Sequence, residues 1–226
     1  REPMSSDAAA DIMDGTHSAL RTHGYAGLTM QDIADEAGLS TAALHYHFDC
    51  KHDLLVAFLD RLFEQFEARI AELDGDDAAE RLLSLVETVL LPPTDDDPHE
   101  FRTALLEIEA QAPYDDAFRA RLERFDETFT ARVRSILEMG VEEGTFAADV
   151  DPDEVASFVV TYVRGARTQN VAVGTPLDDS LAAPYNKEKM VVVHMTPFSL
   201  GVGLENDALG AIIERNSTYP CEKKDT

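Results

Sequence analysis

The chain has 226 residues and a formal net charge of −25, with 44 acidic side chains against 19 Lys and Arg. This length is enough for one or two domains with a real core. The charge argues against the usual nucleic-acid and membrane-surface proteins, which carry basic patches. There is no long apolar run or apolar leader, and two cysteines make no disulfide framework, so we expect no membrane span and a cytoplasmic location.

The charge is distributed unevenly, and its composition changes near residue 183. Residues 1–183 hold 14 cationic and 38 acidic side chains, and Lys51 is their single lysine. Residues 184–226 hold 5 cationic and 6 acidic side chains, and 4 of the 5 cations are Lys. The first part is typical of a protein adapted to high salt, a halophilic composition in which carboxylates keep the surface hydrated. An ordinary acidic cytosolic protein is the alternative.

Helix start and stop signals predict three helices in the first 50 residues. The first spans residues 6–24 and ends at a glycine. Thr29 and Asp32 have the spacing of a capping box for the second helix. After a short glycine-containing turn, Ser40 caps a third helix over residues 41–47. Two short helices around such a turn are typical of a helix-turn-helix, which presents its second helix to the DNA major groove.

The rest of the chain up to residue 174 also has helical periodicity. Apolar stripes predict helices over residues 51–73, 78–91, 101–112, 118–140 and 152–174, with Gly144 as the alternative end of the fourth of these. Because no alternating strand pattern occurs there, the predicted fold class is all-α. The stretch MVVVHMTPFSLGVGL, residues 190–204, is apolar and β-branched with Pro and Gly, and predicts strands in a short β-prone C-terminal tail.

The segment GYAGLTMQDIADEAGLSTAALHYHFDCKHDLL, residues 24–55, resembles the N-terminal domain of the tetracycline-repressor (TetR) family. The shared pattern is a Gly-Tyr pair, a Thr-capped helix, Ala-Gly-Leu-Ser, a short recognition helix, and a Lys followed by Leu-Leu. The resemblance implies a ligand-responsive repressor that binds palindromic double-stranded DNA as a homodimer. It implies a DNA-binding domain over residues 1–50 and a helical ligand-binding and dimerisation domain over 51–183.

The resemblance also implies which side chains contact DNA: Thr29, Ser40, Thr41, Ala42, His45, Tyr46 and Lys51. Thr29 and Lys51 would meet phosphates, and His45 and Tyr46 would reach the backbone or base edges. The two hydroxyl residues Thr29 and Ser40 would cap their helices whether or not DNA is present.

Some positions on or beside the expected recognition helix are interpreted as structural or depart from the family pattern. Leu44 and Phe48 are expected in the core, and His47 is expected to pack rather than to contact DNA. The family often has a cation at Thr41, a Tyr at His45 and a Ser or Asn at Cys50. Cys50 is interpreted as a small capping residue, with a redox-sensing thiol as the alternative.

Residues 28–48 contain three acidic residues and neither Lys nor Arg, although DNA is a polyanion. Backbone N–H groups at helix N-termini and hydroxyls bind phosphate without side-chain cations. At molar salt the Debye length shrinks to roughly 3 Å, which screens distant carboxylates. We therefore expect DNA binding that needs high salt or that falls less steeply with salt than usual.

The second domain is expected to bind an apolar small-molecule effector. Candidate cavity residues are Phe63, Phe66, Leu105, Phe129 and Tyr162, with plain core packing as the alternative for each. The sequence shows no metal-ligand spacing, phosphate loop or nucleophile elbow. We therefore expect no enzyme activity, no metal and no cofactor.

The tail resembles a second family. Residues 191–226 contain Thr196-Pro197, Ser199-Leu200-Gly201 and Ile213-Glu214-Arg215-Asn216, which resemble the start of the substrate-binding domain of DnaK-type heat-shock chaperones. Residues 184–226 are therefore expected to form a poorly integrated chaperone-like tail. The alternative function is that of a chimeric or peptide-interaction protein with impaired DNA binding.

Overall fold

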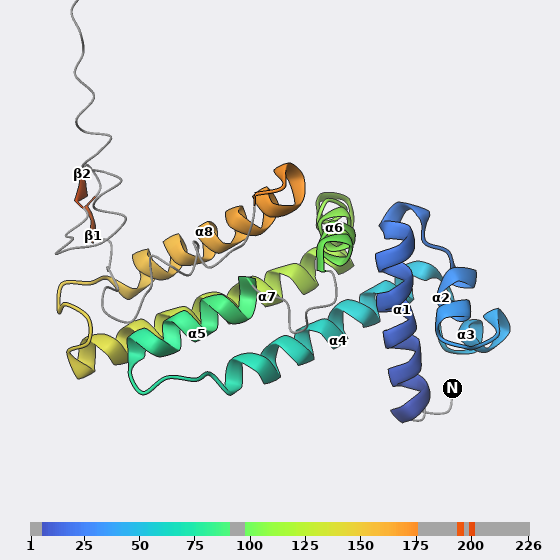
Figure 1. Cartoon of the computed structure of the whole chain (residues 1–226), viewed down its shortest axis with the longest axis horizontal. Helices are drawn as coiled ribbons and strands as arrows, with labels where there is room; N and C mark the ends of the chain where they lie inside the picture. The colour runs from blue at the N-terminus through green and yellow to red at the C-terminus, as the bar shows by residue number, and fades with distance from the viewer. Residues whose placement is uncertain (1–5, 91–97, 176–193, 197–198, 202–226) are drawn as a thin grey trace, which may run out of the picture. The chain divides into compact units, whose positions relative to one another are not determined.

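The computed structural model describes residues 6–90, 98–175, 194–196 and 199–201. Its helices are α1 (Ser6–Gly27), α2 (Met30–Glu36), α3 (Thr41–His47), α4 (Lys51–Ala71), α5 (Ala78–Leu90), α6 (Pro98–Glu109), α7 (Asp116–Glu143) and α8 (Pro152–Val173) (Figure 1). A single 3₁₀ turn, Ala112–Tyr114, lies between α6 and α7. The prediction of an all-α fold with an N-terminal three-helix domain is confirmed. None of the helices that the structure describes is long and apolar enough to cross a membrane.

Two short strands lie in the tail, β1 (His194–Thr196) and β2 (Ser199–Gly201). They pair antiparallel, with Met195 opposite Leu200. Strands were predicted here from the β-branched apolar sequence. The remaining tail residues, including most of the chaperone-like motif, lie outside the described residues.

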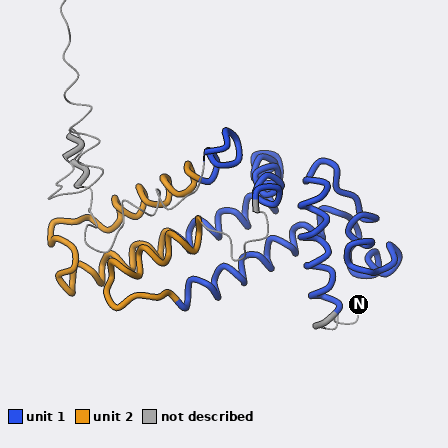
Figure 2. Tube along the Cα trace, viewed as in Figure 1, with its two compact units in different colours: residues 1–72, 92–129, 167–175 blue, residues 73–91, 130–166, 176–226 orange. Residues whose placement is uncertain are grey.

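The chain divides into two compact units (Figure 2). The first contains residues 1–72, 92–129 and 167–175, and the second contains residues 73–91, 130–166 and 176–226. The first unit therefore joins the predicted DNA-binding helices to α6 and to the first half of α7. This grouping comes from packing between segments that are distant in sequence.

The first unit has a core shared by α1 to α4, α6 and α7. Its buried members are Ile12, Met13, Ala19, Leu20, Leu28, Ile33, Ala34, Leu44, Leu54, Leu55, Phe58, Leu59, Ala104, Ile108 and Phe118. Leu44 is fully buried as predicted, and Phe48 packs partly buried against this core. The three N-terminal helices have too little apolar surface of their own, so α4, α6 and the start of α7 complete the core.

The end of α1 is set by a glycine, as predicted. Gly24 has φ +64° and ψ 174°, a conformation that ends the regular helix before residue 27. The next backbone N–H, that of Tyr25, donates to Glu107 Oε2 of α6 at 2.6 Å. This contact joins the end of α1 to a helix that follows 82 residues later in the chain.

The second unit packs α5, the second half of α7 and most of α8. Its buried side chains include Leu82, Leu85, Val86, Val133, Ile136, Leu137, Phe146, Val159 and Val163. Gly140 of α7 lies under Phe146, because a Cβ added there would be 2.3 Å from the ring. The close approach explains a glycine in the last turn of this long helix.

His17 gives the first unit a pH dependence. Its ring lies 4.2 Å from the Phe101 ring, centroid to centroid, where α1 meets α6. Burial, and next the charge of Arg21, lower the pKa of His17, while Asp14 opposes them. The unfolded chain therefore binds a proton at higher pH than the folded one, so stability falls as the pH drops through and below about 6.5.

We expect His17→Gln to flatten this slope of stability against pH. Denaturant unfolding between pH 5 and 8 measures it, with wild type and variant compared at each pH. An unchanged slope in the variant would assign the pH dependence to other groups.

Candidate nucleic-acid interface

The turn between α2 and α3 is closed by backbone hydrogen bonds. The Leu39 N–H donates to the Ala34 carbonyl at 2.9 Å, and the Gly38 N–H donates to Asp35 at 3.2 Å. Gly38 has φ +65°, which favours a residue without a Cβ. Ser40 then caps α3, because its Oγ accepts the Ala43 N–H at 3.1 Å.

One face of α3 is exposed and the opposite face is anchored in the core. Ala42, His45 and Tyr46 are exposed, and 54% of the Tyr46 surface is accessible. Leu44 is fully buried on the other side. His47 is half-buried and its ring lies edge-on to Tyr46 at 5.0 Å. The helix thus presents the predicted contact residues to solvent while its apolar side fixes its orientation.

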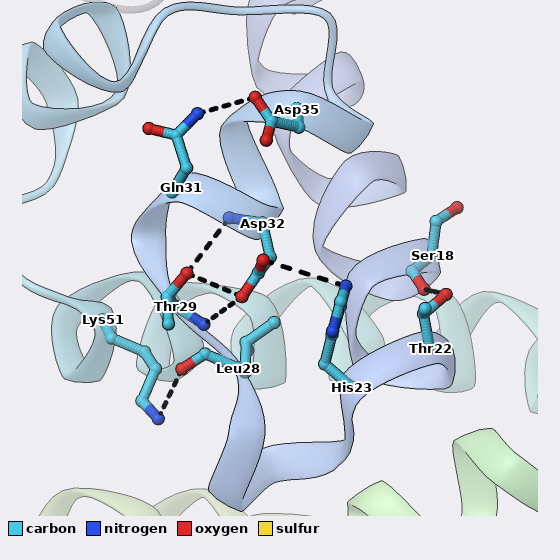
Figure 3. A network of polar contacts seen from close by, with 9 residues as sticks. All are labelled: Ser18, Thr22, His23, Leu28, Thr29, Gln31, Asp32, Asp35 and Lys51. Carbon is cyan, nitrogen blue, oxygen red and sulfur yellow. Dashed lines mark hydrogen bonds and ion pairs between the residues drawn. The ribbon is translucent and has the colours of Figure 1, made fainter.

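The capping box of α2 engages the exposed Thr29 hydroxyl in hydrogen bonds with Asp32 (Figure 3). The Asp32 N–H donates to Thr29 Oγ1 at 3.2 Å, and the Thr29 N–H donates to Asp32 Oδ2 at 2.8 Å. The Thr29 hydroxyl also donates to this carboxylate at 2.6 Å. These hydrogen bonds lower the pKa of Asp32, the side-chain one most. Thr29 is therefore primarily a cap in this structure.

Thr41 and Gln31 connect the two helices. The Thr41 hydroxyl donates to Gln31 Oε1 at 2.5 Å, and Gln31 Nε2 donates to Asp35 Oδ1 at 2.6 Å. Gln31 was not among the predicted site residues, although an exposed amide at the start of α2 is a plausible signal. Because Ser40 Oγ accepts a backbone N–H, its O–H is left as a donor, which makes Ser40 better placed for phosphate than Thr29 or Thr41.

Lys51 points back to the end of α1. Its Nζ donates to the Leu28 carbonyl at 2.9 Å (Figure 3). It also donates to the Tyr25 carbonyl at 3.1 Å. It also lies 5.0 Å from the centroid of the Tyr25 ring. A protonated amine thus satisfies one carbonyl in the last turn of α1 and one just beyond it. The structure thus gives Lys51 a stabilising role, and its phosphate contact stays a prediction.

We expect Lys51→Met to lower the free energy of unfolding by about 1–2 kcal/mol without any DNA present, because it removes charged donors from two carbonyls. Arg61→Met is the matched control, because Arg61 is an exposed cation of the same helix that pairs only across one turn with Glu64. Thermal unfolding of the DNA-free chain measures both. If the Lys51 variant were as stable as the wild type, the hydrogen bonds of Lys51 would not stabilise the fold. The predicted phosphate contact would then be its only role.

Comparison with known proteins decides the family. Residues 12–58 match the model for bacterial regulatory proteins of the tetR family, and residues 78–183 match the C-terminal domain model of BetI-type transcriptional repressors. A TetR transcription regulator from Haloarcula marismortui is 40% identical, with a TM-score of 0.72, over 80% of this chain and 94% of that one. This chain belongs to the TetR family.

Further relatives agree with this TetR assignment. The transcriptional repressor AcnR of Corynebacterium glutamicum is 27% identical over 69% of this chain and 77% of its own length. A transcriptional regulator from Saccharomonospora viridis, solved in complex with choline, is 25% identical with a TM-score of 0.68 over 80% of this chain and 95% of that one. The family consists of transcriptional regulators and not of enzymes, so its match over the N-terminal helices makes the present TetR protein a DNA-binding regulator.

The predicted effector residues of this TetR protein lie in different surroundings. Phe63 is 1% exposed, and its ring lies 5.0 Å from Phe125 and 6.4 Å from Phe66. Leu105 packs against the N-terminal core, and Phe129 is 6% exposed. Only Phe63 and Phe66 are brought into direct ring contact, and Phe125 completes their cluster. Phe125 lies in the helix predicted over residues 118–140 but was not among the predicted effector residues.

Tyr162 belongs to the second unit and lies on α8. Its ring stacks on Phe158 at 6.2 Å with an interplanar angle of 21°. Both side chains remain 37% exposed. A half-exposed aromatic pair on one helix face is more typical of an interaction surface than of a closed cavity.

Proposed function

We propose that this regulator is a repressor that binds palindromic DNA as a homodimer at high salt and is released by an apolar small molecule. The observation that carries the DNA-binding part is the arrangement of α3. Ala42, His45 and Tyr46 face solvent, Ser40 opens the helix with a free O–H donor, and Leu44 anchors the opposite face. We propose these residues, with Thr41 and Lys51 in secondary roles, as the DNA contacts.

The salt requirement follows from the charge of the first 183 residues. Several arginines already pair with acids, as in Arg121–Asp60 at 3.1 Å and Arg124–Glu67 at 3.8 Å. The remaining carboxylates repel one another and DNA until salt screens them. Few free cations also mean that few counterions are released on binding, so affinity depends weakly on salt. A cytoplasm rich in salt is the proposed location.

The homodimer is supported by the exposed aromatic pair on α8. Phe158 and Tyr162 would lose their remaining exposed surface if the same helix of a second copy covered them. Sedimentation of the chain before and after Phe158→Ala tests this. A variant that stays dimeric at wild-type concentrations would place the interface elsewhere.

The effector is proposed to be apolar because the aromatic cluster of Phe63, Phe66 and Phe125 dominates the candidate region. The Arg124 guanidinium lies 3.7 Å from the centroid of the Phe63 ring and covers that face. An apolar ligand would therefore meet Phe66 and Phe125 more readily than Phe63. We expect a panel of apolar compounds to release a bound duplex from the wild-type protein. We expect Phe66→Ala to reduce this release.

The tail is proposed to be a chaperone-like segment outside the regulator. The match to the C-terminal domain of the family ends at residue 183, and the charge composition changes at the same place. The runner-up function is a chimeric or peptide-interaction protein in which this tail dominates. Truncation after residue 183 should preserve DNA binding if the tail is a graft, and loss of binding would favour the runner-up.

The deciding experiment is selection of bound duplexes from a random pool by the full chain in molar KCl. An enriched palindrome is expected, since half-site spacing mirrors the two-fold symmetry of a dimer. Tyr46→Ala should weaken binding to it, whereas Tyr114→Ala, at a tyrosine that is 90% exposed in another part of the first unit, should not. Absence of any enriched sequence, or affinity falling by decades between low and molar KCl, would contradict the proposal.

A further inference from the structure

Three side chains with metal-binding atoms meet at the start of α4. Cys50, His52 and Asp53 each offer one ligand atom, and these atoms all lie within 4.8 Å of one another. They supply a thiol sulfur, an imidazole nitrogen and a carboxylate oxygen. The run Cys-x-His-Asp does not have a familiar metal-ligand spacing, and its three ligand atoms come together only through the fold at the start of α4.

Helix capping does not account for Cys50. It occupies the N-cap position of α4 with an extended backbone, φ −152° and ψ 170°, yet its side chain makes no capping hydrogen bond. Ser, Thr, Asp or Asn would satisfy a backbone N–H there. The thiol is exposed and is not committed to the helix.

Asp115 orients the imidazole of His52 from the other side. Its Oδ2 lies 2.8 Å from His52 Nε2, and its Oδ1 accepts the N–H groups of Ala117 and Phe118 at 2.9 and 3.0 Å. The His52 ring also packs at 5.1 Å from the Phe118 ring. The carboxylate is thus fixed at the start of α7 and takes the Nε2–H as a donor.

In a neutral ring, donation from Nε2–H to Asp115 leaves the lone pair on His52 Nδ1. Nδ1 lies 3.5 Å from Asp53 Oδ1, on the side of the ligand cluster. A histidine whose second nitrogen donates to a carboxylate is the usual arrangement behind a metal ligand, because the carboxylate fixes the tautomer and raises the basicity of the ligating nitrogen.

We infer that Cys50, His52 and Asp53 bind a borderline divalent cation of the Zn²⁺ class, with Asp115 as the positioning residue. Mixed sulfur, nitrogen and oxygen donors select such cations, whereas Mg²⁺ and Ca²⁺ take oxygen ligands. Three protein ligands leave a fourth tetrahedral position for water. The thiol releases one proton on binding, so the local charge rises by one unit beside Lys51 and just after α3.

Co²⁺ titration of the full chain, in molar KCl with a phosphine reductant, tests the inference. We expect a sulfur-to-cobalt charge-transfer absorption and tetrahedral visible bands that saturate at one equivalent per chain and are displaced by Zn²⁺. Cys50→Ser should abolish the charge-transfer absorption, and the matched control Cys221→Ser should retain it, since Cys221 is the other thiol of the chain.

Asp115→Asn should weaken Co²⁺ binding by about 10- to 100-fold while the charge-transfer absorption is retained at saturation. Circular dichroism of each variant checks that the helices are intact. Absence of the absorption from the wild type, or its persistence in Cys50→Ser, would overturn the inference. The titration needs no DNA, so its failure is independent of the proposed repressor function.

Discussion

Replacing Phe118 with alanine is expected to lower the free energy of unfolding by about 3–5 kcal/mol, the range for a fully buried phenylalanine in a packed core. Phe118 is 1% exposed at the start of α7. Its ring lies 6.3 Å from Tyr25, edge-on, and 5.1 Å from His52. The side chain therefore joins α7 to the end of α1 and to the start of α4, and its loss leaves a cavity among three helices.

Denaturant unfolding in molar KCl measures the effect. Phe118→Leu keeps most of the volume and should cost much less. Tyr114→Ala, only a few residues away but 90% exposed, should change stability by no more than about 0.5 kcal/mol. A small effect of Phe118→Ala would mean that the N-terminal helices are stable without α7, and would restrict their core to α1 through α4 and α6.

Local signals predicted the N-terminal helices because those signals act within a few residues. The capping box of Thr29 and Asp32, the Ser40 cap and the Gly24 stop all form as the spacing indicates. Such contacts need no knowledge of the rest of the fold. The same is true of the exposed and buried faces of α3, which follow from helical periodicity.

Contacts between distant segments were not predicted, and they decide several roles. Nothing in the sequence indicates that Glu107 accepts the Tyr25 N–H, or that Asp115 fixes His52. The family resemblance predicts that Lys51 contacts a phosphate, whereas in the structure its amine donates to the Tyr25 and Leu28 carbonyls near the end of α1. A side chain with a long flexible stem has several partners within reach, and only the packed fold selects among them.

Gly15→Ala is expected to destabilise the DNA-binding helices by about 1–3 kcal/mol, as overpacking of a tight contact does. A Cβ at Gly15 would lie 2.6 Å from the Ala37 backbone nitrogen and 2.7 Å from its Cα. These are backbone atoms at the end of α2, so no side chain can move aside. The helix α2 must shift away from α1, and the turn to α3 moves with it.

Gly165→Ala is the matched control, because Gly165 lies within α8 and an added Cβ meets nothing within 4 Å. There the change removes backbone entropy from the unfolded chain and should stabilise by up to about 1 kcal/mol. The same gain in helix propensity acts at Gly15. A net loss of stability in Gly15→Ala therefore isolates the steric cost of the α1–α2 contact. If both variants gained stability, α1 and α2 could separate without a cost in the free energy of folding.

Gly15→Ala also tests DNA recognition. If it weakens binding to the selected duplex beyond its effect on folding, then the position of α3, and not only its sequence, governs recognition.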